Sequence, residues 1–363
     1  MTTPGCGAAL RAPGGSRPRW SGVDAARGLA VLGMMAAHTW PRDASQSELV
    51  VDGRPSVLFA VVAGVALGLV TGGDEPPMRN RGTARGHLAL RAAVLIVLGL
   101  LLWMLPSGIA IVLDYYGVMF LMLVPLLLAP RWLLTVVAVG LLVAAPLARD
   151  RIVDVTGAQP NGPLASGDIA AALVDYLLTG YYPALLWLPL LLVGVLCARA
   201  GLASSRVRVM MVGLGAAASL FGYGAAAVLP GVDATAHSST TAELLGAGGL
   251  AVAIIGVALF ALDGQSPRRA VRFIAAPLVA LGRVAFTAYV VHVVIIAALS
   301  PFGPAGQFDA IVGIPLLVAL SLGGIALGLF CQARSRRGPF EWLLSTVAGL
   351  PFRSTGQDAR LGA

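Results

Sequence analysis

The chain has 363 residues, of which 58% are hydrophobic and only 12% are charged, and its mean hydropathy is +0.85. A soluble domain carries about 25% charged residues, so this chain cannot cover a water-facing surface and we expect lipid to be its solvent. Its net charge of +8 comes from Arg alone, because the sequence has no Lys. In a membrane protein such charge mainly sets orientation, and we expect no nucleic-acid partner.

Ten apolar segments follow one another along most of the chain. Because a helix that spans a bilayer needs about 20 such residues, we predict an all-α fold, a polytopic transmembrane helical bundle of about ten helices. The tight joins at Pro106 and Pro130 leave nine or eleven helices open. The predicted spans are 22–40, 55–73, 88–106, 108–130, 131–148, 181–200, 206–229, 243–263, 273–299 and 310–331.

The segments outside these spans divide the chain into three parts. Residues 1–19 are rich in Gly, Pro and Arg, which predicts a disordered cytoplasmic tail ahead of a membrane domain at 20–332. Residues 333–363 predict a basic cytoplasmic tail in which 338–343 form a short interfacial helix. The longest loop, 149–180, contains an amphipathic stretch that we also expect at the interface.

Arg residues are unevenly distributed over alternate loops. With the N-terminus inside, nineteen of them lie in cytoplasmic segments and four in external segments. The positive-inside rule then predicts a multi-pass protein of the plasma (inner) membrane with both termini in the cytoplasm. On this topology Cys6, Cys197 and Cys331 lie at or near the cytoplasmic side, where no disulfide is expected, and their spacing fits no metal site.

The first predicted span carries Asp24, Arg27 and His38. Charged side chains inside a bilayer are costly and indicate function by default. Arg27 and His38 are eleven residues apart, so they share a helix face and lie about 16 Å apart along the axis. Asp24 lies one turn from Arg27 and can pair with it. The alternative is an interfacial Asp24–Arg27 pair and a His38 that reaches the outer surface.

Two later spans place further polar residues in the outer half of the predicted bilayer. Asp114 lies about two turns below the external surface, at the predicted depth of His38, and a carboxylate beside a histidine orients a general base. The 273–299 span carries Arg283 at its inner end and Tyr289 and His292 near its outer end. Structural hydrogen bonds between helices remain the alternative for each of these residues.

Aromatic and acidic residues at the outer ends of two spans are candidate substrate contacts. Tyr181 and Tyr182 fit either such contacts or an interfacial aromatic belt, whereas Trp187 lies deeper and fits a cavity wall. Glu243 lies in the first turn of its span, a pattern that also fits an N-cap at Thr240 or Thr241.

These polar residues divide by predicted depth. Arg27 and Arg283 lie at the inner mouth and suit phosphate, whereas the histidines and Asp114 lie in the outer half and suit proton transfer. A donor with a charged head on a long thin arm, such as acyl-CoA, would enter from the cytoplasm while an acceptor approaches from outside. We expect no metal.

Several segments resemble the membrane acyltransferases that include heparan-alpha-glucosaminide N-acetyltransferase and the YeiB-like bacterial proteins of unassigned function. The similar segments are 22–38, 52–64, 281–292 and 337–342. The resemblance implies transfer of an acyl group, such as acetyl, from cytoplasmic acyl-CoA to an external sugar, glycan or lipid-linked acceptor. The sugar acetyltransferase carries its active histidine after the first helix, but residues 40–54 here contain none; the matching position is His38, as in other bacterial membrane O-acyltransferases.

On this hypothesis His38 deprotonates an acceptor hydroxyl or amine, Asp114 orients His38, and His292 and Tyr289 stabilise charge or position the acceptor. A covalent acyl-histidine intermediate is equally open. Arg27 and Arg283, with Asp24, hold the phosphates of the donor. The substrate contacts are Tyr181, Tyr182, Trp187 and Glu243.

A proton-coupled transporter or exporter remains the rival function and an envelope scaffold a third one. The oligomeric state stays open, a homodimer included.

Overall fold

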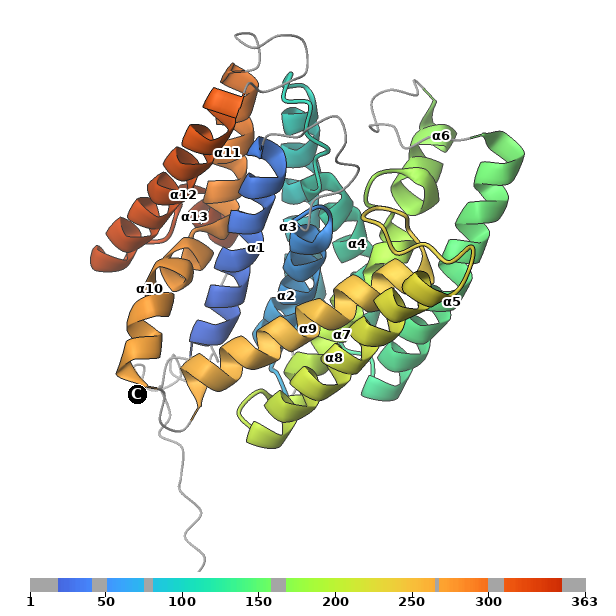
Figure 1. The fold of residues 1–363 in the computed structure, drawn as a ribbon, viewed down its shortest axis with the longest axis horizontal. Helices are drawn as coiled ribbons and strands as arrows, with labels where there is room; N and C mark the ends of the chain where they lie inside the picture. The colour runs from blue at the N-terminus through green and yellow to red at the C-terminus, as the bar shows by residue number, and fades with distance from the viewer. Residues whose placement is uncertain are drawn as a thin grey trace, which may run out of the picture.

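The structure is a computed structural model that describes residues 19–40, 51–74, 81–157, 168–264, 268–299 and 310–347. All regular elements in these ranges are helices, which confirms the all-α class (Figure 1). The predicted disorder at 1–18 and the end of the tail at 348–363 lie outside the described residues. The elements are α1 (Ser21–Thr39), α2 (Arg54–Val70), α3 (Arg81–Trp103), α4 (Leu113–Leu126), α5 (Arg131–Thr156), α6 (Ile169–Val174), the π-helical turn η1 (Asp175–Thr179), α7 (Ala184–Gly201), α8 (Ser205–Val228), α9 (Thr241–Asp263), α10 (Arg269–Arg283), α11 (Ala285–Leu299), α12 (Ala310–Ala333) and α13 (Pro339–Val347).

Every predicted span contains a helix, but the count of ten spans is not established. Within the described ranges, six helices are long and apolar enough to cross a membrane, and up to seven are if the bent pair α10 and α11 forms one span. α2 and α4 are apolar but shorter, and α1, whose hydropathy is lowered by Asp24, Arg27 and His38, is not among the six. The fold is a helical membrane bundle, and the orientation of its termini stays a prediction.

The continuous helix predicted at 273–299 is wrong. α10 ends at Arg283, α11 begins at Ala285, and the two axes are bent by 72°. At the break, Gly282 packs so closely on α1 that a Cβ there would collide with the carbonyl of Asp24. The apolar run in the sequence gave no sign of this contact, which depends on a helix more than 240 residues earlier.

The helices form one bundle in which α10, α11 and α12 lie on the opposite side from α5, while α8 and α9 run side by side (Figure 1). α1 packs against α2, α9, α10 and α12, and α2 packs along α7. Gly64 and Gly194 let α2 and α7 approach until their backbones touch, as small residues do between membrane helices. α1 is therefore surrounded by helices from both halves of the chain.

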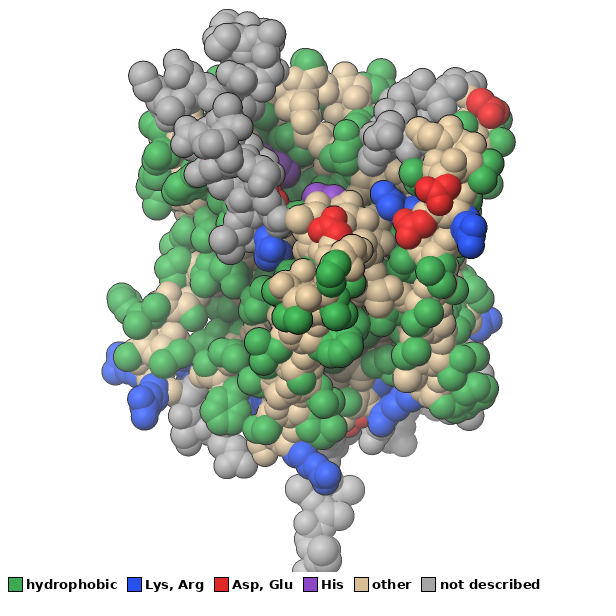
Figure 2. All heavy atoms as spheres, turned by 45° about the vertical axis from the view of Figure 1, so that its right-hand side comes forward, with side chains coloured by type: hydrophobic (Ala, Val, Ile, Leu, Met, Phe, Trp, Pro, Cys, Tyr) green, Lys and Arg blue, Asp and Glu red, His purple; other side chains and the backbone are tan. Residues whose placement is uncertain are grey.

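The outer surface of the bundle fits a lipid environment. Figure 2 shows a broad belt of hydrophobic side chains, with Arg side chains along its lower edge and Arg, acidic and His side chains near its upper part. The exposed apolar residues in this part of the fold include Val136, Val139 and Val143 of α5, and Leu220 and Phe221 of α8. Contiguous exposed apolar surface of this extent marks contact with a membrane.

Candidate functional site: two polar clusters at the ends of α1

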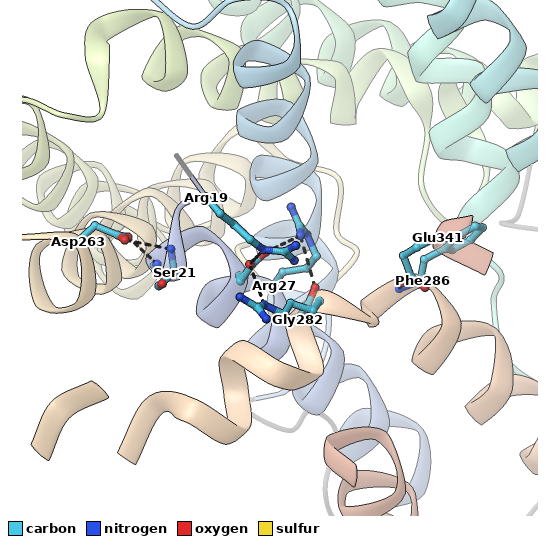
Figure 3. A network of polar contacts seen from close by, with 10 residues as sticks. Arg19, Ser21, Arg27, Asp263, Gly282, Phe286 and Glu341 are labelled. Atoms are coloured by element: carbon cyan, nitrogen blue, oxygen red, sulfur yellow. Dashed lines mark hydrogen bonds and ion pairs between the residues drawn. The ribbon is translucent and has the colours of Figure 1, made fainter. Parts of the chain in front are cut away.

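The first cluster, here the arginine cluster, comprises Arg19, Arg27, Arg283 and Asp24 at the start of α1 (Figure 3). The Asp24 carboxylate accepts a hydrogen bond from Arg19 Nε at 2.6 Å and another from Arg27 Nη1 at 3.0 Å. Arg283 Nε lies 3.9 Å from the same carboxylate. Three guanidinium groups thus surround one buried carboxylate and leave positive charge in excess.

The start of α1 is fixed by contacts with distant elements. The Asp263 carboxylate, at the end of α9, accepts hydrogen bonds from Ser21 N at 3.0 Å and Gly22 N at 2.7 Å, so it caps a helix whose own N-cap residue, Trp20, has no capping side chain. Arg27 Nη1 also lies 3.4 Å from the Gly282 carbonyl, at the α10–α11 break. The predicted Asp24–Arg27 pair is therefore present, and Arg283 lies beside it.

The arginine cluster has the character of an anion site. The side chains of Arg19, Arg27 and Arg283 are 56%, 23% and 29% exposed, whereas that of Asp24 is 6% exposed. Partly exposed guanidinium groups keep donors available to a ligand while the buried carboxylate holds them together. The group suits a phosphate better than a neutral ligand.

The second cluster, here the histidine pair, comprises His38 at the other end of α1 and His292 of α11. His38 Nδ1 and His292 Nε2 are 3.0 Å apart, and the two rings are parallel within 9°. His292 is fully buried, and the ring of Tyr289 stands nearly perpendicular to it with the centroids 5.2 Å apart. The structure thus brings together three of the four predicted catalytic residues.

The hydrogen bonds define the tautomers of the pair when both rings are neutral. His292 Nδ1 lies 3.3 Å from the Ala288 carbonyl, which only accepts, so Nδ1 carries the proton and Nε2 of His292 is the acceptor. His38 Nδ1 then donates to that Nε2, and the lone pair of His38 is on its own Nε2. This is the arrangement in which a second group orients a histidine base.

Among the described residues no hydrogen bond joins Asp114 to His38, and the position beside His38 that was predicted for Asp114 is taken by His292. The buried Asp114 carboxylate accepts hydrogen bonds from Trp103 Nε1 at 3.0 Å and from the Tyr176 hydroxyl at 2.9 Å, both through Oδ2. Its other oxygen, Oδ1, has no hydrogen-bond partner within the described ranges. The depth of Asp114 in the membrane stays a prediction, and the sequence could not show which helices face this residue.

The predicted substrate contacts fall into separate places. Tyr182 and Trp187 are buried edge to face, and the ring of His237 stacks on Trp187 and meets Tyr182 edge-on. Tyr181 instead packs on Trp103 and is 38% exposed. His237 was not among the predicted site residues, because its loop carries no periodic pattern that would place it over Trp187.

Glu243 holds a loop together. Its carboxylate accepts hydrogen bonds from the backbone N–H groups of His237 and Ser239, each at 2.6 Å. Both of those residues have positive φ, of 62° and 60°, so the carboxylate stabilises an uncommon backbone conformation. Thr240 caps α9 by accepting from Glu243 N at 3.1 Å, which confirms the predicted N-cap. A contact between Glu243 and substrate stays a prediction.

Comparison with protein families finds matches to two known families. Residues 19–224, more than half of the chain, match the family described as heparan-alpha-glucosaminide N-acetyltransferase, catalytic. The chain belongs to this acetyltransferase family. Residues 194–350 also match a family described as a protein of unknown function (DUF418). No individually curated protein matches the chain.

Membership of the acetyltransferase family indicates a multi-pass membrane protein with a membrane acetyltransferase-like function. Each cluster contains residues from both matched regions. His38 lies in the acetyltransferase match and His292 in the other, and the same holds for Arg27 and Arg283. The two regions therefore build each cluster together, and neither region contains a complete one.

Proposed function

We propose that the protein is a membrane acyltransferase that moves an acyl group, with acetyl as the first candidate, from cytoplasmic acyl-CoA to an acceptor on the other side of the membrane. The acceptor is a sugar, a glycan or a lipid-linked sugar. The observation that carries the proposal is the pairing of His38 Nδ1 with His292 Nε2 at 3.0 Å at the opposite end of α1 from three clustered arginines.

The donor fits the arginine cluster by charge and by distance. Phosphate groups suit Arg27, Arg283 and Arg19, whose excess positive charge Asp24 does not neutralise. Arg27 and His38 are separated by eleven residues of continuous helix, or about 16 Å. A donor with a charged head and an extended arm spans that distance along α1 with its thioester toward His38.

The proposed transfer forms one bond to the acceptor, breaks the bond to CoA and moves one proton through His38. The acceptor oxygen or nitrogen attacks the thioester carbonyl carbon while its proton passes to His38 Nε2, and the carbon–sulfur bond breaks as CoA leaves as a thiolate. The proton on His38 then passes to that thiolate or to water. His292 holds the His38 ring in place, and Tyr289, packed on His292, fixes that ring in turn.

A second candidate function is proton-coupled transport, and the 72° bend between α10 and α11 favours it. Broken helices line the substrate sites of many transporters. In that case the histidine pair would relay protons and no CoA would be released.

The test is sided transfer in sealed vesicles. Acetyl-CoA labelled in its acetyl group is supplied on one side, with glucosamine and glucose enclosed on the other and the membrane lipids as a third acceptor. We expect labelled product to form across the membrane and free CoA to remain on the donor side. His87→Ala, which removes a histidine outside both clusters, is the matched control for His38→Ala.

The outcomes separate the two candidates. Transfer and CoA release that are equal in wild type and His38→Ala contradict the role of His38, whereas a wild type that shows neither contradicts the acyltransferase. Sugar flux that follows an imposed pH gradient without CoA release assigns the protein to the transporters. Label in the lipid fraction alone selects a lipid-linked acceptor.

A further inference from the structure

The break between α10 and α11 is capped by a residue from the C-terminal part of the chain. Glu341 of α13 accepts hydrogen bonds through Oε1 from Phe286 N at 2.7 Å and Thr287 N at 3.1 Å. Its other oxygen, Oε2, accepts from the Thr287 hydroxyl at 2.5 Å. Figure 3 shows Glu341 against Phe286, on the far side of the break from the arginine cluster.

α11 needs this cap because it begins inside the protein without one of its own. The first N–H groups of any helix lack intrahelical partners, and Val284, the residue before α11, has no side chain that can accept a hydrogen bond. A carboxylate placed there satisfies two of these groups and is favoured by the helix dipole. Glu341 thus replaces the N-cap that the local sequence lacks.

The surroundings of Glu341 are shaped to hold it. Phe340 N donates to the Thr287 hydroxyl oxygen at 3.1 Å, and the rings of Phe340 and Phe286 meet edge to face. A Cβ at Gly338 would collide with Glu341 Oε2 and lie 2.8 Å from Thr287 Oγ1. Only glycine fits at 338 while the carboxylate keeps this position.

α11 is also the helix that carries the histidine pair's second member. Thr287, bonded by Glu341, lies five residues before His292, about 7.5 Å along the axis. Because the bend separates the axis of α11 from that of α10, α10 does not set the direction of α11. Besides the packing of α11 on α1 and α3, the bond to α13 constrains α11 at its first turn.

We propose that Glu341 is a positioning residue that fixes α11 so that His292 meets His38. α13, for which the sequence predicted a short interfacial helix, thereby acts on the first turn of α11, about one and a half turns before His292. The effect on rate rests on the proposed function, whereas the effect on the histidine pair does not.

The experiment measures the tautomers of the histidine pair directly. The chain has only 4 histidines, so ¹⁵N-histidine NMR of the full-length protein in nanodiscs gives few signals, each assigned by a single His→Gln variant. Wild type is compared with Glu341→Ala, Glu341→Gln and Gly338→Ala. Gly213→Ala is the control, because no atom lies within 4 Å of a Cβ at that position. Acetyl-CoA binding and transfer are measured on the same samples.

We expect the tautomer signals of His38 and His292 to change in Glu341→Ala and Gly338→Ala, with those of His87 and His237 unchanged. Glu341→Gln, which keeps an oxygen for the two N–H groups, should retain most of the wild-type pattern. The kcat of transfer should fall about 100-fold in Glu341→Ala without a change in acetyl-CoA affinity, as for a misplacement of about 1 Å.

A folded Glu341→Ala protein with unaltered His38 and His292 signals overturns the inference. If Glu341→Ala does not fold, Gly338→Ala decides on the same criterion. If wild type shows no transfer at all, the proposed function fails, while the NMR comparison still decides on Glu341.

Discussion

The polar clusters at the two ends of α1 differ in exposure and in packing. At one end, partly exposed arginines surround a buried carboxylate, and their charge acts on a ligand over a range of positions. At the other end, the fully buried His292 meets His38 through one hydrogen bond of 3.0 Å and is packed by Tyr289. The first arrangement tolerates small shifts and the second does not, so binding and chemistry should be separable by mutation.

The largest effect is expected at the histidine pair. His38→Ala removes the proposed base, and general-base catalysis contributes about 10²–10⁴-fold to rate, so kcat should fall by that factor. The affinity for acetyl-CoA, measured by isothermal titration calorimetry, should stay within about twofold because the arginine cluster is intact.

His87→Ala controls for the loss of a histidine elsewhere, and it should keep wild-type rate and affinity. A His38→Ala protein that loses acetyl-CoA binding along with rate would show that the two ends are not independent, and the comparison would then be wrong.

The next effect concerns the arginine cluster. A hydrogen bond to a charged group contributes about 1.5–3 kcal/mol, so Arg27→Ala should weaken acetyl-CoA binding about 10- to 100-fold. Added salt should weaken wild-type binding more than that of the variant, because the lost interaction is electrostatic. Titration calorimetry at two salt concentrations measures both quantities.

Arg151→Ala, at an exposed site on α5, is the matched control and should leave binding unchanged. Equal affinities of Arg27→Ala and wild type would remove the arginine cluster as the donor site.

The smallest effect is expected for Tyr289→Phe. Within the described ranges, the Tyr289 hydroxyl accepts a hydrogen bond from Val112 N at 3.3 Å, whereas the ring packs on His292. Loss of a bond of this kind costs about 0.5–1.5 kcal/mol, so kcat should fall less than about tenfold. Tyr289→Ala, which removes the ring, should reduce kcat further. A fall in Tyr289→Phe as large as that in His38→Ala would assign the hydroxyl a direct role in the reaction.

The sequence predicted the positions of the helices well because each consists of a long apolar run whose limits are marked by Gly, Pro or Arg. It did not predict the break at Val284, although Gly282 and Arg283 interrupt the apolar run of 273–299 there, because glycine and a single arginine also occur in unbroken membrane helices. The cause lies elsewhere: Gly282 packs on α1, and Glu341, 54 residues after Thr287, caps α11.

The sequence also singled out His38, His292, Arg27 and Arg283 as candidate site residues, because polar residues in apolar runs are conspicuous. Their partners were harder to predict. Asp114 was expected beside His38, but it bonds Trp103 and Tyr176 instead. Which helices touch depends on close packing at small residues such as Gly28 and Gly64, and periodicity within one helix carries no information about its neighbour.

The position of α1 in the bundle has a consequence for biosynthesis. α1 is made before α9 and α10, yet its N-terminal cap comes from Asp263, about 240 residues later, and its charged residues meet Arg283 later still. A helix with Asp24 and Arg27 is costly to leave in lipid without those partners. α1 therefore reaches its final packed position late in assembly, after α9 and α10 have been inserted. A chain that stops after α8 would contain the whole of the acetyltransferase match but would lack the contacts of its first helix with α9, α10 and α12.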